Sequence, residues 1–392
     1  MRIAFIFHDA SIYGAPKSLL DLIDGLEKLN ADITCFAILP HEGPLLQEIK
    51  RRKIPYQVVS YRRWVHKIQE PWRISARKVI HSLRDNRLFR AGMSLRAAFQ
   101  IQKHLKHWNV DIVYTNTSVI VVGALASYLA KKKHVWHIRE FQEIDQGLTL
   151  DWGKKVFATV VAKTNAIIFI SKTLHQYYQP WVKGVRTQVI YNGVATKDDF
   201  DRIKKNKQEY QRKDQPFTFC IVGRISPAKG QLEAVQALNI LVKEGWKPRL
   251  LIAGKGNQKA ISTLVRRLQL EEYVHLIGHV DSPYQSVYFL SDVCLMCSSH
   301  EAFGRVTVEA MASGLPVIGK KNKYTGTVEL IQENQTGLLY EGNEVELAAE
   351  MRRLLMDPAM GQQLGSNAWM YAKDHLNREQ YVQQVYDLLV SL

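Results

Sequence analysis

The sequence predicts an α/β protein built from two Rossmann-like, doubly wound domains. Short apolar runs alternate with amphipathic stretches of helical period, which is the pattern of buried parallel strands covered by helices. Several of the runs lead into glycine-containing loops, and the pattern starts again at residue 217 after a charged stretch. A length of 392 residues exceeds one ordinary core and suggests two domains.

The first half opens with a strand at residues 3–7, a loop that contains Gly14, and a helix at residues 18–29. Strand, glycine loop and helix form the opening unit of a doubly wound domain. The other elements of this half follow from the same patterns. Strands are predicted at 33–39, 56–59, 111–115, 134–138, 166–171 and 187–191, and helices at 45–53 and 119–130, the latter capped by residues 116–118.

A basic block lies within this half. Residues 62–106 carry twelve Lys and Arg against two acidic residues, so about ten of the net +16 charges lie there. Aromatic and aliphatic residues are interleaved with the cations, which predicts two amphipathic helices. A solvated helical face and a surface for an anionic membrane or another polyanion are both open alternatives.

The sequence favours a soluble or surface-attached protein. The longest apolar run, residues 119–130, is too short for a membrane span, which needs about 20 residues. No signal-peptide pattern precedes the first strand. We therefore expect a cytoplasmic location, peripheral on the inner face of the cell membrane if the basic block binds lipid.

Residues 196–216 are charged, poor in large apolar side chains, and end at Pro216, so we predict an interdomain linker. Asp199 and Asp201 formally make a metal-binding D-x-D pattern, but the pattern does not end a strand and cations surround it, which favours a solvated linker. The predicted domains are therefore residues 1–195 and 217–374, with a final helix at 375–392 that packs back on the first domain.

The second half repeats the strand–loop–helix pattern. Strands are predicted at 217–222, 249–253, 274–277, 292–296 and 316–319, and helices at 231–243, 305–313, 344–355 and 377–391. Glycine loops follow the first three strands at residues 223–230, 254–256 and 278–280. The G-x-G pattern at residues 254–256 is by itself weak evidence for a nucleotide-binding site.

Residues 297–316 form the centre of the second half. Glu301 precedes a free helix N-terminus, which is a ready anion site, and Glu309 lies two turns into the helix. Eight helical residues span about 12 Å, whereas glycosidase carboxyls lie roughly 5 to 9.5 Å apart. The two carboxylates therefore fit separate parts of one long ligand with an anionic middle, such as a sugar nucleotide. A solvated acidic helix start is the alternative.

Further candidates lie at loops and strand ends. Arg224 and Lys229 share one loop and could reach the same diphosphate, with ordinary surface charge as the alternative. His137 ends a predicted strand, where ligands bind in such sheets, although a core histidine is equally common. Cys294, Cys297 and His300 could supply three ligands of a zinc site, but the sequence shows no fourth ligand. We therefore predict that the cysteines are core residues and that no metal binds here.

Together these residues resemble a known family, the retaining, metal-independent GT-B glycosyltransferases, which include enzymes of bacterial cell-surface glycans. The resemblance covers most of the chain and is strongest over residues 223–329. It rests on Glu301 and Glu309 as E-x7-E, Gly223-Arg224 with Lys229-Gly230, Gly278 with Val280, and residues 312–317. The sequence departs from the family pattern in two places. Residues 13–16 stand where the family usually has a glycine pair, and residues 138–140 follow His137 in place of the commoner aspartate. Both departures lie on the acceptor side.

The resemblance implies that residues 217–374 bind the nucleotide sugar and residues 1–195 the acceptor. It implies that Glu301 contacts the sugar ring, that His137 lies beside the transferred sugar, and that no metal or other cofactor is needed. The donor-binding residues would be Gly14, Arg224, Lys229, Val280, Phe303, Gly304, Arg305, Val306, Thr307 and Glu309, with Glu309 on the ribose and the backbone of Val280 on the base.

The predicted function is a retaining transfer of a hexose or deoxyhexose from a nucleoside-diphosphate sugar to a glycan or lipid-linked glycan in bacterial surface polysaccharide synthesis. The predicted partners are the nucleotide-sugar donor, the glycan acceptor and an anionic membrane at residues 62–106, with no nucleic acid. Two alternatives are a sugar-nucleotide epimerase or hydrolase of the same shape and a non-catalytic polyanion- or membrane-binding protein.

Overall fold

A computed structural model describes residues 1–12, 14–67, 86–210 and 215–392. The chain divides into two compact units, each of them α/β with a parallel sheet. Unit 1 comprises Met1–Tyr191 and Tyr381–Leu392, and unit 2 comprises Asn192–Gln380. The predicted pair of Rossmann-like domains is confirmed.

The sheet of unit 1 has seven parallel strands in the order β3-β2-β1-β5-β6-β8-β9. The order reverses between β1 and β5, which makes this the topological switch point. β4 and β7 form a separate antiparallel pair. The strands are β1 (Arg2–Ile6), β2 (Thr34–Leu39), β3 (Tyr56–Val58), β4 (Val65–Lys67), β5 (Ile112–Asn116), β6 (Lys133–Ile138), β7 (Leu148–Leu150), β8 (Ala166–Phe169) and β9 (Arg186–Val189).

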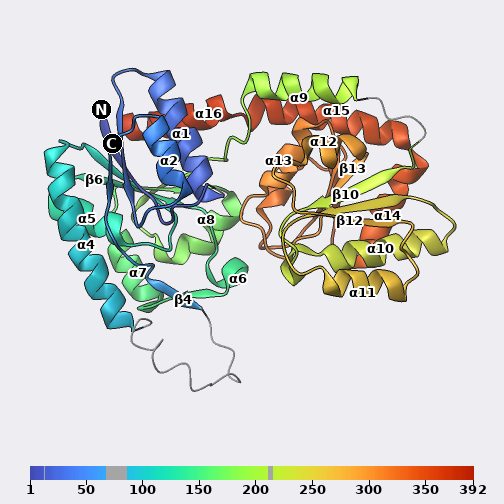
Figure 1. Cartoon of the computed structure of the whole chain (residues 1–392), viewed down its shortest axis with the longest axis horizontal. Helices are drawn as coiled ribbons and strands as arrows, with labels where there is room; N and C mark the ends of the chain where they lie inside the picture. Colours follow the sequence, from blue (N-terminus) through green and yellow to red (C-terminus); the bar gives the residue numbers. More distant parts are fainter. Residues whose placement is uncertain (13, 68–85, 211–214) are drawn as a thin grey trace. The chain divides into compact units, whose positions relative to one another are not determined.

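Helices cover both faces of this sheet (Figure 1). α1 (Ala15–Leu29), α2 (Pro44–Arg51) and α16 (Arg378–Val390) contribute to one core cluster with the central strands. α4 (Arg87–His107) and α5 (Val122–Ala130) pack against each other, and α5 lies on β5 and β6. Shorter helices complete the unit: α6 (Glu143–Gln146), α7 (Gly153–Val161), α8 (Lys172–Tyr178) and the 3-10 turn η1 (Gln179–Trp181).

One expectation for unit 1 needs correction. α5 begins at Val122 rather than at residue 119, because Ser118 binds Glu140 through its backbone N–H and its hydroxyl instead of capping the helix. The basic block contains strand β4 and one helix, α4, among its described residues. The remainder of the block, residues 68–85, lies outside the described residues, so the expectation of two helices stays a prediction.

The sheet of unit 2 has six parallel strands in the order β12-β11-β10-β13-β14-β15, with the switch point between β10 and β13. Helices α10, α11 and α14 lie on one side and α12, α13 and α15 on the other (Figure 1). The strands are β10 (Thr218–Val222), β11 (Arg249–Ala253), β12 (Val274–Gly278), β13 (Val293–Met296), β14 (Val317–Lys320) and β15 (Gly337–Tyr340). The helices are α10 (Gln231–Lys243), α11 (Lys259–Arg267), α12 (Pro283–Ser286), α13 (Arg305–Ala312), α14 (Glu344–Met356) and α15 (Pro358–His375), with 3-10 turns η2 (Pro227–Lys229), η3 (Tyr288–Leu290) and η4 (Gly326–Glu329).

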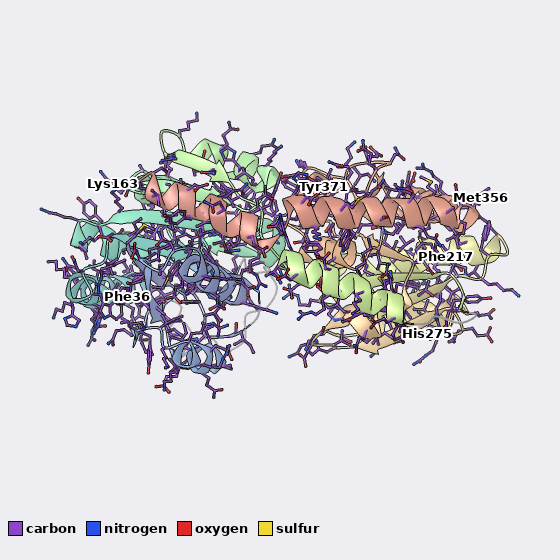
Figure 2. All side chains as sticks on the ribbon, turned by 90° about the horizontal axis from the view of Figure 1, so that it is seen from above. Phe36, Lys163, Phe217, His275, Met356 and Tyr371 are labelled. Atoms are coloured by element: carbon purple, nitrogen blue, oxygen red, sulfur yellow. The ribbon has the colours of Figure 1, made fainter. Side chains whose placement is uncertain are left out.

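The stretch predicted as a linker contains helix α9 (Lys197–Glu209), which belongs to unit 2. Thr196 and Asp199 form a capping box at its start, so Asp199 accepts a hydrogen bond from the backbone of Thr196. Phe200 and Ile203 are the buried residues of the helix, and this low apolar content concealed it in the sequence. α9 lies beside α15, which runs between the labelled Met356 and Tyr371 in Figure 2.

Over the described ranges, helices long and apolar enough to cross a bilayer are absent.

Candidate functional site

The loops after β10 and β13 meet at the switch point of unit 2, where doubly wound sheets bind ligands. Gly230 has φ +72°, and a Cβ there would lie 2.3 Å from the carbonyl oxygen of Cys297, so only glycine permits the approach. Ser299 donates its backbone N–H to the carbonyl of Ala228 at 2.9 Å. These contacts hold the loop of Arg224 and Lys229 against the loop of Glu301.

Lys229 and Glu301 form an ion pair in which Nζ lies 2.5 Å from Oε2. The other carboxylate oxygen of Glu301 accepts the backbone N–H of Gly304 at 3.1 Å. The Glu301 backbone is fixed as well, because its N–H donates a hydrogen bond of 2.9 Å to the backbone carbonyl of Tyr324. Arg224 is exposed and has no ion-pair partner among the residues that the structure describes. The two loops therefore present one paired cation and one unpaired cation beside a fixed carboxylate.

The start of α13 is shaped by Gly304, the residue before the helix. Its φ is +96°, and a Cβ there would lie 2.4 Å from Oγ1 of Thr327 and 3.1 Å from Oγ1 of Thr307. Both hydroxyls are buried and have no hydrogen-bond partner within the described part of the chain. Buried polar groups normally have partners. Two such hydroxyls beside a helix N-terminus suit an anion that accepts hydrogen bonds.

Glu309 lies farther along α13 and has different neighbours. Tyr288 donates its hydroxyl to Oε2 of Glu309 at 3.3 Å, and Arg305 lies 3.8 Å from Oε1. Burial and, to a lesser extent, the Glu309 charge raise the pKa of Tyr288 well above 10, so Tyr288 stays a donor. Glu301 and Glu309 are therefore held by separate sets of partners.

The other predicted residues of unit 2 lie around the same end of the sheet. Phe303 is buried beside Glu301, and Val306 in the first turn of α13 is half-buried. Val280 is half-buried and follows β12, whose last residue, Gly278, accepts the backbone N–H of Gly254 at 2.7 Å. The loops after β10, β11 and β12 thus lie on the side of the sheet that carries Arg224.

In unit 1, His137 lies inside the protein near the end of β6. Its Nδ1 lies 2.6 Å from the hydroxyl of Tyr114 and 3.1 Å from Nη2 of Arg139. Because arginine can only donate, Nδ1 accepts and the proton of the neutral ring sits on Nε2. Nε2 is buried and has no partner among the described residues. Burial, and next the charge of Arg139, lower the pKa of His137 well below 6.5, so the ring is neutral near pH 7.

Gly14 precedes α1 with φ +60°, and a Cβ at this position would meet nothing within 4 Å. Next to it, the carbonyl oxygen of Ala15 accepts a hydrogen bond of 3.1 Å from Nδ2 of Asn116. Oδ1 of Asn116 also accepts a hydrogen bond of 2.6 Å from Nε of Arg139. The loop that begins α1 is therefore tied to the ends of β5 and β6, on the same edge of the sheet as His137.

The structure thus groups the predicted residues of unit 2 at one sheet edge and Gly14 with His137 at an edge of unit 1. The sequence pointed to Thr307 but not to Thr327, Tyr288 or Asn116 as neighbours of these residues. Thr327 follows β14, the strand next to β13, and loops after adjacent parallel strands meet. That rule could have identified Thr327, whereas no sequence pattern marks Tyr288. Cys294 and Cys297 are buried free thiols, and no group of three or more potential metal ligands occurs within the described ranges.

Both halves of the chain match known protein families. Residues 202–369 match the family described as Glycosyl transferases group 1. Residues 12–198 match the family described as Glycosyltransferase Family 4.

Similar proteins include bacterial enzymes. N-acetyl-alpha-D-glucosaminyl L-malate synthase of Bacillus anthracis is 30% identical over 52% of this chain and 54% of its own length. The capsular polysaccharide biosynthesis glycosyltransferase CapM of Staphylococcus aureus is 29% identical over 45% of this chain and 47% of its own length. The chain thus spans about half the length of these two relatives.

The fold also matches solved structures. A crystal structure of Anabaena Alr3699/HepE in complex with UDP superposes with a TM-score of 0.78 at 23% identity, and the match covers 100% of both chains. This likeness shows that the two units have the fold of GT-B glycosyltransferases.

Proposed function

We propose that this chain, whose two halves match the models described as Glycosyl transferases group 1 and Glycosyltransferase Family 4, transfers a hexose or deoxyhexose from a nucleoside-diphosphate sugar with retention of configuration. The acceptor is a glycan or a lipid-linked glycan in bacterial surface polysaccharide synthesis. The observation that carries the proposal is the start of α13, where Glu301, Lys229 and the two partnerless hydroxyls of Thr307 and Thr327 come together.

The start of α13 is suited to hold the diphosphate. Its first backbone N–H groups lack helical partners, and glycine at position 304 lets the hydroxyls of Thr307 and Thr327 lie close to the backbone there. Lys229 and Arg224 supply two cations from the facing loop. Such fixed donors stabilise the negative charge that develops on the departing phosphate, and each is worth roughly 10² to 10³ in rate. We propose that these groups do this without a metal ion.

The two glutamates are assigned to the two ends of the donor. Glu309 receives the ribose hydroxyls, and the backbone of Val280 receives the base. Glu301 accepts a hydrogen bond from a hydroxyl of the transferred sugar. Lys229 leaves its ion pair with Glu301 and contacts a phosphate oxygen instead. His137 carries a proton on a partnerless Nε2 and donates it as a hydrogen bond to the sugar. Gly14 lets the backbone of unit 1 approach the phosphate.

The proposed reaction takes place on one face of the sugar. The bond between the anomeric carbon and the phosphate oxygen breaks, and the acceptor oxygen bonds to the same face of that carbon. The departing phosphate oxygen takes the proton of the acceptor hydroxyl. Retention follows because the new bond replaces the old one without inversion.

Donor binding is the first test. Isothermal titration of the full chain with a panel of nucleoside diphosphates and their sugars should identify at least one ligand, and UDP is tested first because the Anabaena relative was crystallised with it. Transfer to a glycan acceptor would separate this proposal from an epimerase or hydrolase, which needs no acceptor. Failure to bind any nucleoside diphosphate would favour the polyanion-binding alternative.

We also propose peripheral contact with an anionic membrane through α4. This helix exposes four large apolar side chains although its opposite side packs on the unit. Exposed apolar residues bordered by cations are typical of helices that lie in a lipid interface. The apolar residues are Leu88, Phe89, Leu95 and Phe99, with exposures of 48–70%, and the exposed cations are Arg87, Arg96, Lys103 and Lys106.

Vesicle flotation tests this contact. With vesicles that contain an anionic lipid, Leu95→Asp combined with Phe99→Asp should abolish flotation. Val345→Asp is the matched control, because Val345 is 59% exposed but belongs to unit 2. The membrane proposal would be abandoned if the control and the double variant floated equally well, or if the wild-type chain did not float at low salt.

A further inference from the structure

A cavity of about 430 Å³ lies in unit 1, next to the switch point of its sheet. His8 and Asp9 follow β1, His41 follows β2, and Ile120 belongs to the loop after β5. Ligands bind outside the carboxyl ends of strands at this point of a doubly wound sheet. The volume is within the range of small-molecule sites, and it would hold a sugar with one substituent.

Cations are concentrated in the lining of this cavity. Among the residues that the structure describes, Arg62, Arg63 and Arg90 line it together with a single carboxylate, that of Asp9. Arg63 pairs with Asp9 at 3.1 Å. Arg62 is exposed and has no ion-pair partner in the described part of the chain. The described lining of the cavity therefore has a net positive charge near neutral pH.

Arg90 is fixed at the wall of the cavity. It is nearly buried, and its Nε and Nη2 donate to Asp151 at 2.8 and 2.6 Å in a bidentate pair. His66 contacts the same carboxylate at 2.8 Å. Even if the charge of Asp151 is counted, the three arginines outnumber the two carboxylates.

A second observation points to a missing partner. Nδ1 of His8 is buried and has no hydrogen-bond partner among the described residues. Burial, with a smaller contribution from Arg63, lowers the pKa of His8 to about 4, so its ring is neutral at pH 7. Pro40, Val65 and Ile120 add apolar surface. Apolar walls with a few placed polar groups are the usual composition of a small-molecule site.

We propose that this cavity binds the acceptor and that the acceptor carries an anionic group, a phosphate or a carboxylate, which Arg62 and Arg63 bind. The inference rests on the proposed function, because it assigns a substrate class to the acceptor side of that reaction. Arginine suits the task because its planar fork matches both anions. The apolar wall then faces the sugar ring that carries the anion.

The test compares three probes by isothermal titration of the full chain. Glucose 1-phosphate and glucuronate carry the two candidate anions, and glucose carries neither. We expect one or both anionic probes to bind at least about tenfold more tightly than glucose, which is the effect of one hydrogen bond to a charged group. The probe that binds more tightly identifies phosphate or carboxylate as the recognised group.

Variants locate the binding. Arg62→Gln should weaken binding of the anionic probe by about tenfold and leave UDP binding unchanged. Arg51→Gln is the matched control, because Arg51 is an exposed arginine of unit 1 outside the cavity. Equal binding of glucose and the anionic probes, equal effects of the two variants, or weaker UDP binding in Arg62→Gln would each overturn the inference. If the anionic probe bound but no nucleoside diphosphate did, the proposed function would fail while the anion site stood.

Discussion

Replacing Gly304 by alanine tests whether the start of α13 holds the donor. An L-residue at φ +96° is strained, and such strain costs about 1–2 kcal/mol. The added Cβ would also lie 2.4 Å from Oγ1 of Thr327, closer than any ordinary contact, so this hydroxyl must move. The substitution therefore combines a stability cost with displacement of a proposed ligand contact.

Gly245 provides the matched control. Its φ is +94°, nearly that of Gly304, but a Cβ there meets nothing within 4 Å. Gly245→Ala should therefore report the backbone strain alone, in the same unit. A loss of about 1–2 kcal/mol corresponds to a fall in melting temperature of roughly 2–8 °C for a unit of this size. Gly304→Ala should lose at least as much.

The two variants should differ in donor binding. Gly304→Ala displaces at least the hydroxyl of Thr327 from its place beside the helix start, so UDP or whichever diphosphate binds best should lose about 10- to 100-fold in affinity. Gly245→Ala should keep the wild-type dissociation constant. Isothermal titration below the melting range of both variants measures this. Equal affinities in the two alanine variants would refute our placement of the diphosphate.

Three further predictions concern charge and pH. Glu301→Gln should lower the transfer rate roughly 10²-fold or more, because the sugar loses its carboxylate contact, while diphosphate affinity does not fall. Arg224→Gln should weaken diphosphate binding about tenfold in titration. Melting of unit 1 should shift to lower temperature as the pH falls from 6.5 toward 4. His134 and His137 have lowered pKa values from burial, so only the unfolded chain gains their protons in this window. Burial raises the pKa of Glu140 to about 7, so binding of a proton by Glu140 stabilises the folded unit below that pH. Glu140→Gln removes this stabilisation and should make the melting temperature of unit 1 fall more steeply with falling pH.

Each of these has a clear contrary result. Wild-type transfer by Glu301→Gln would remove Glu301 from the reaction. Unchanged diphosphate affinity in Arg224→Gln would make Arg224 an ordinary surface cation. A melting temperature of unit 1 that stayed constant from pH 6.5 to 4 would contradict the neutral, buried state of the two imidazoles.

The parallel sheets were predictable because their strands are buried on both faces and read as continuous apolar runs. The helix at α13 was predictable because Gly314 and Pro316 mark its end, and it ends at Ala312. By contrast, α9 and α15 were not predicted. α9 buries only two residues, and the buried positions of α15 are Gly361, Leu364, Gly365, Ala368 and Ala372, mostly small side chains. Small buried residues give a weak hydrophobic period.

Part of the site also lay beyond what the sequence could indicate. The E-x7-E spacing points to Glu301 and Glu309 as candidates, but the pairing of Glu301 with Lys229 joins residues 72 positions apart. Thr327 reaches Gly304 from a different loop. Such contacts depend on which strands are neighbours, and strand order is a property of the folded sheet. The cationic cavity of unit 1 depends in the same way on the loops after β1, β2 and β5.

The path of the backbone between the units has a consequence for biosynthesis. Residues 381–392 complete the core of unit 1, where Val382 packs so closely on Gly25 that a Cβ at Gly25 would lie 2.3 Å from it. These residues leave the ribosome after the whole of unit 2. Multidomain proteins usually fold from the N-terminus during translation. Here the core of unit 1 is complete only after residues 381–392 emerge, by which time the whole sequence of unit 2 has already left the ribosome.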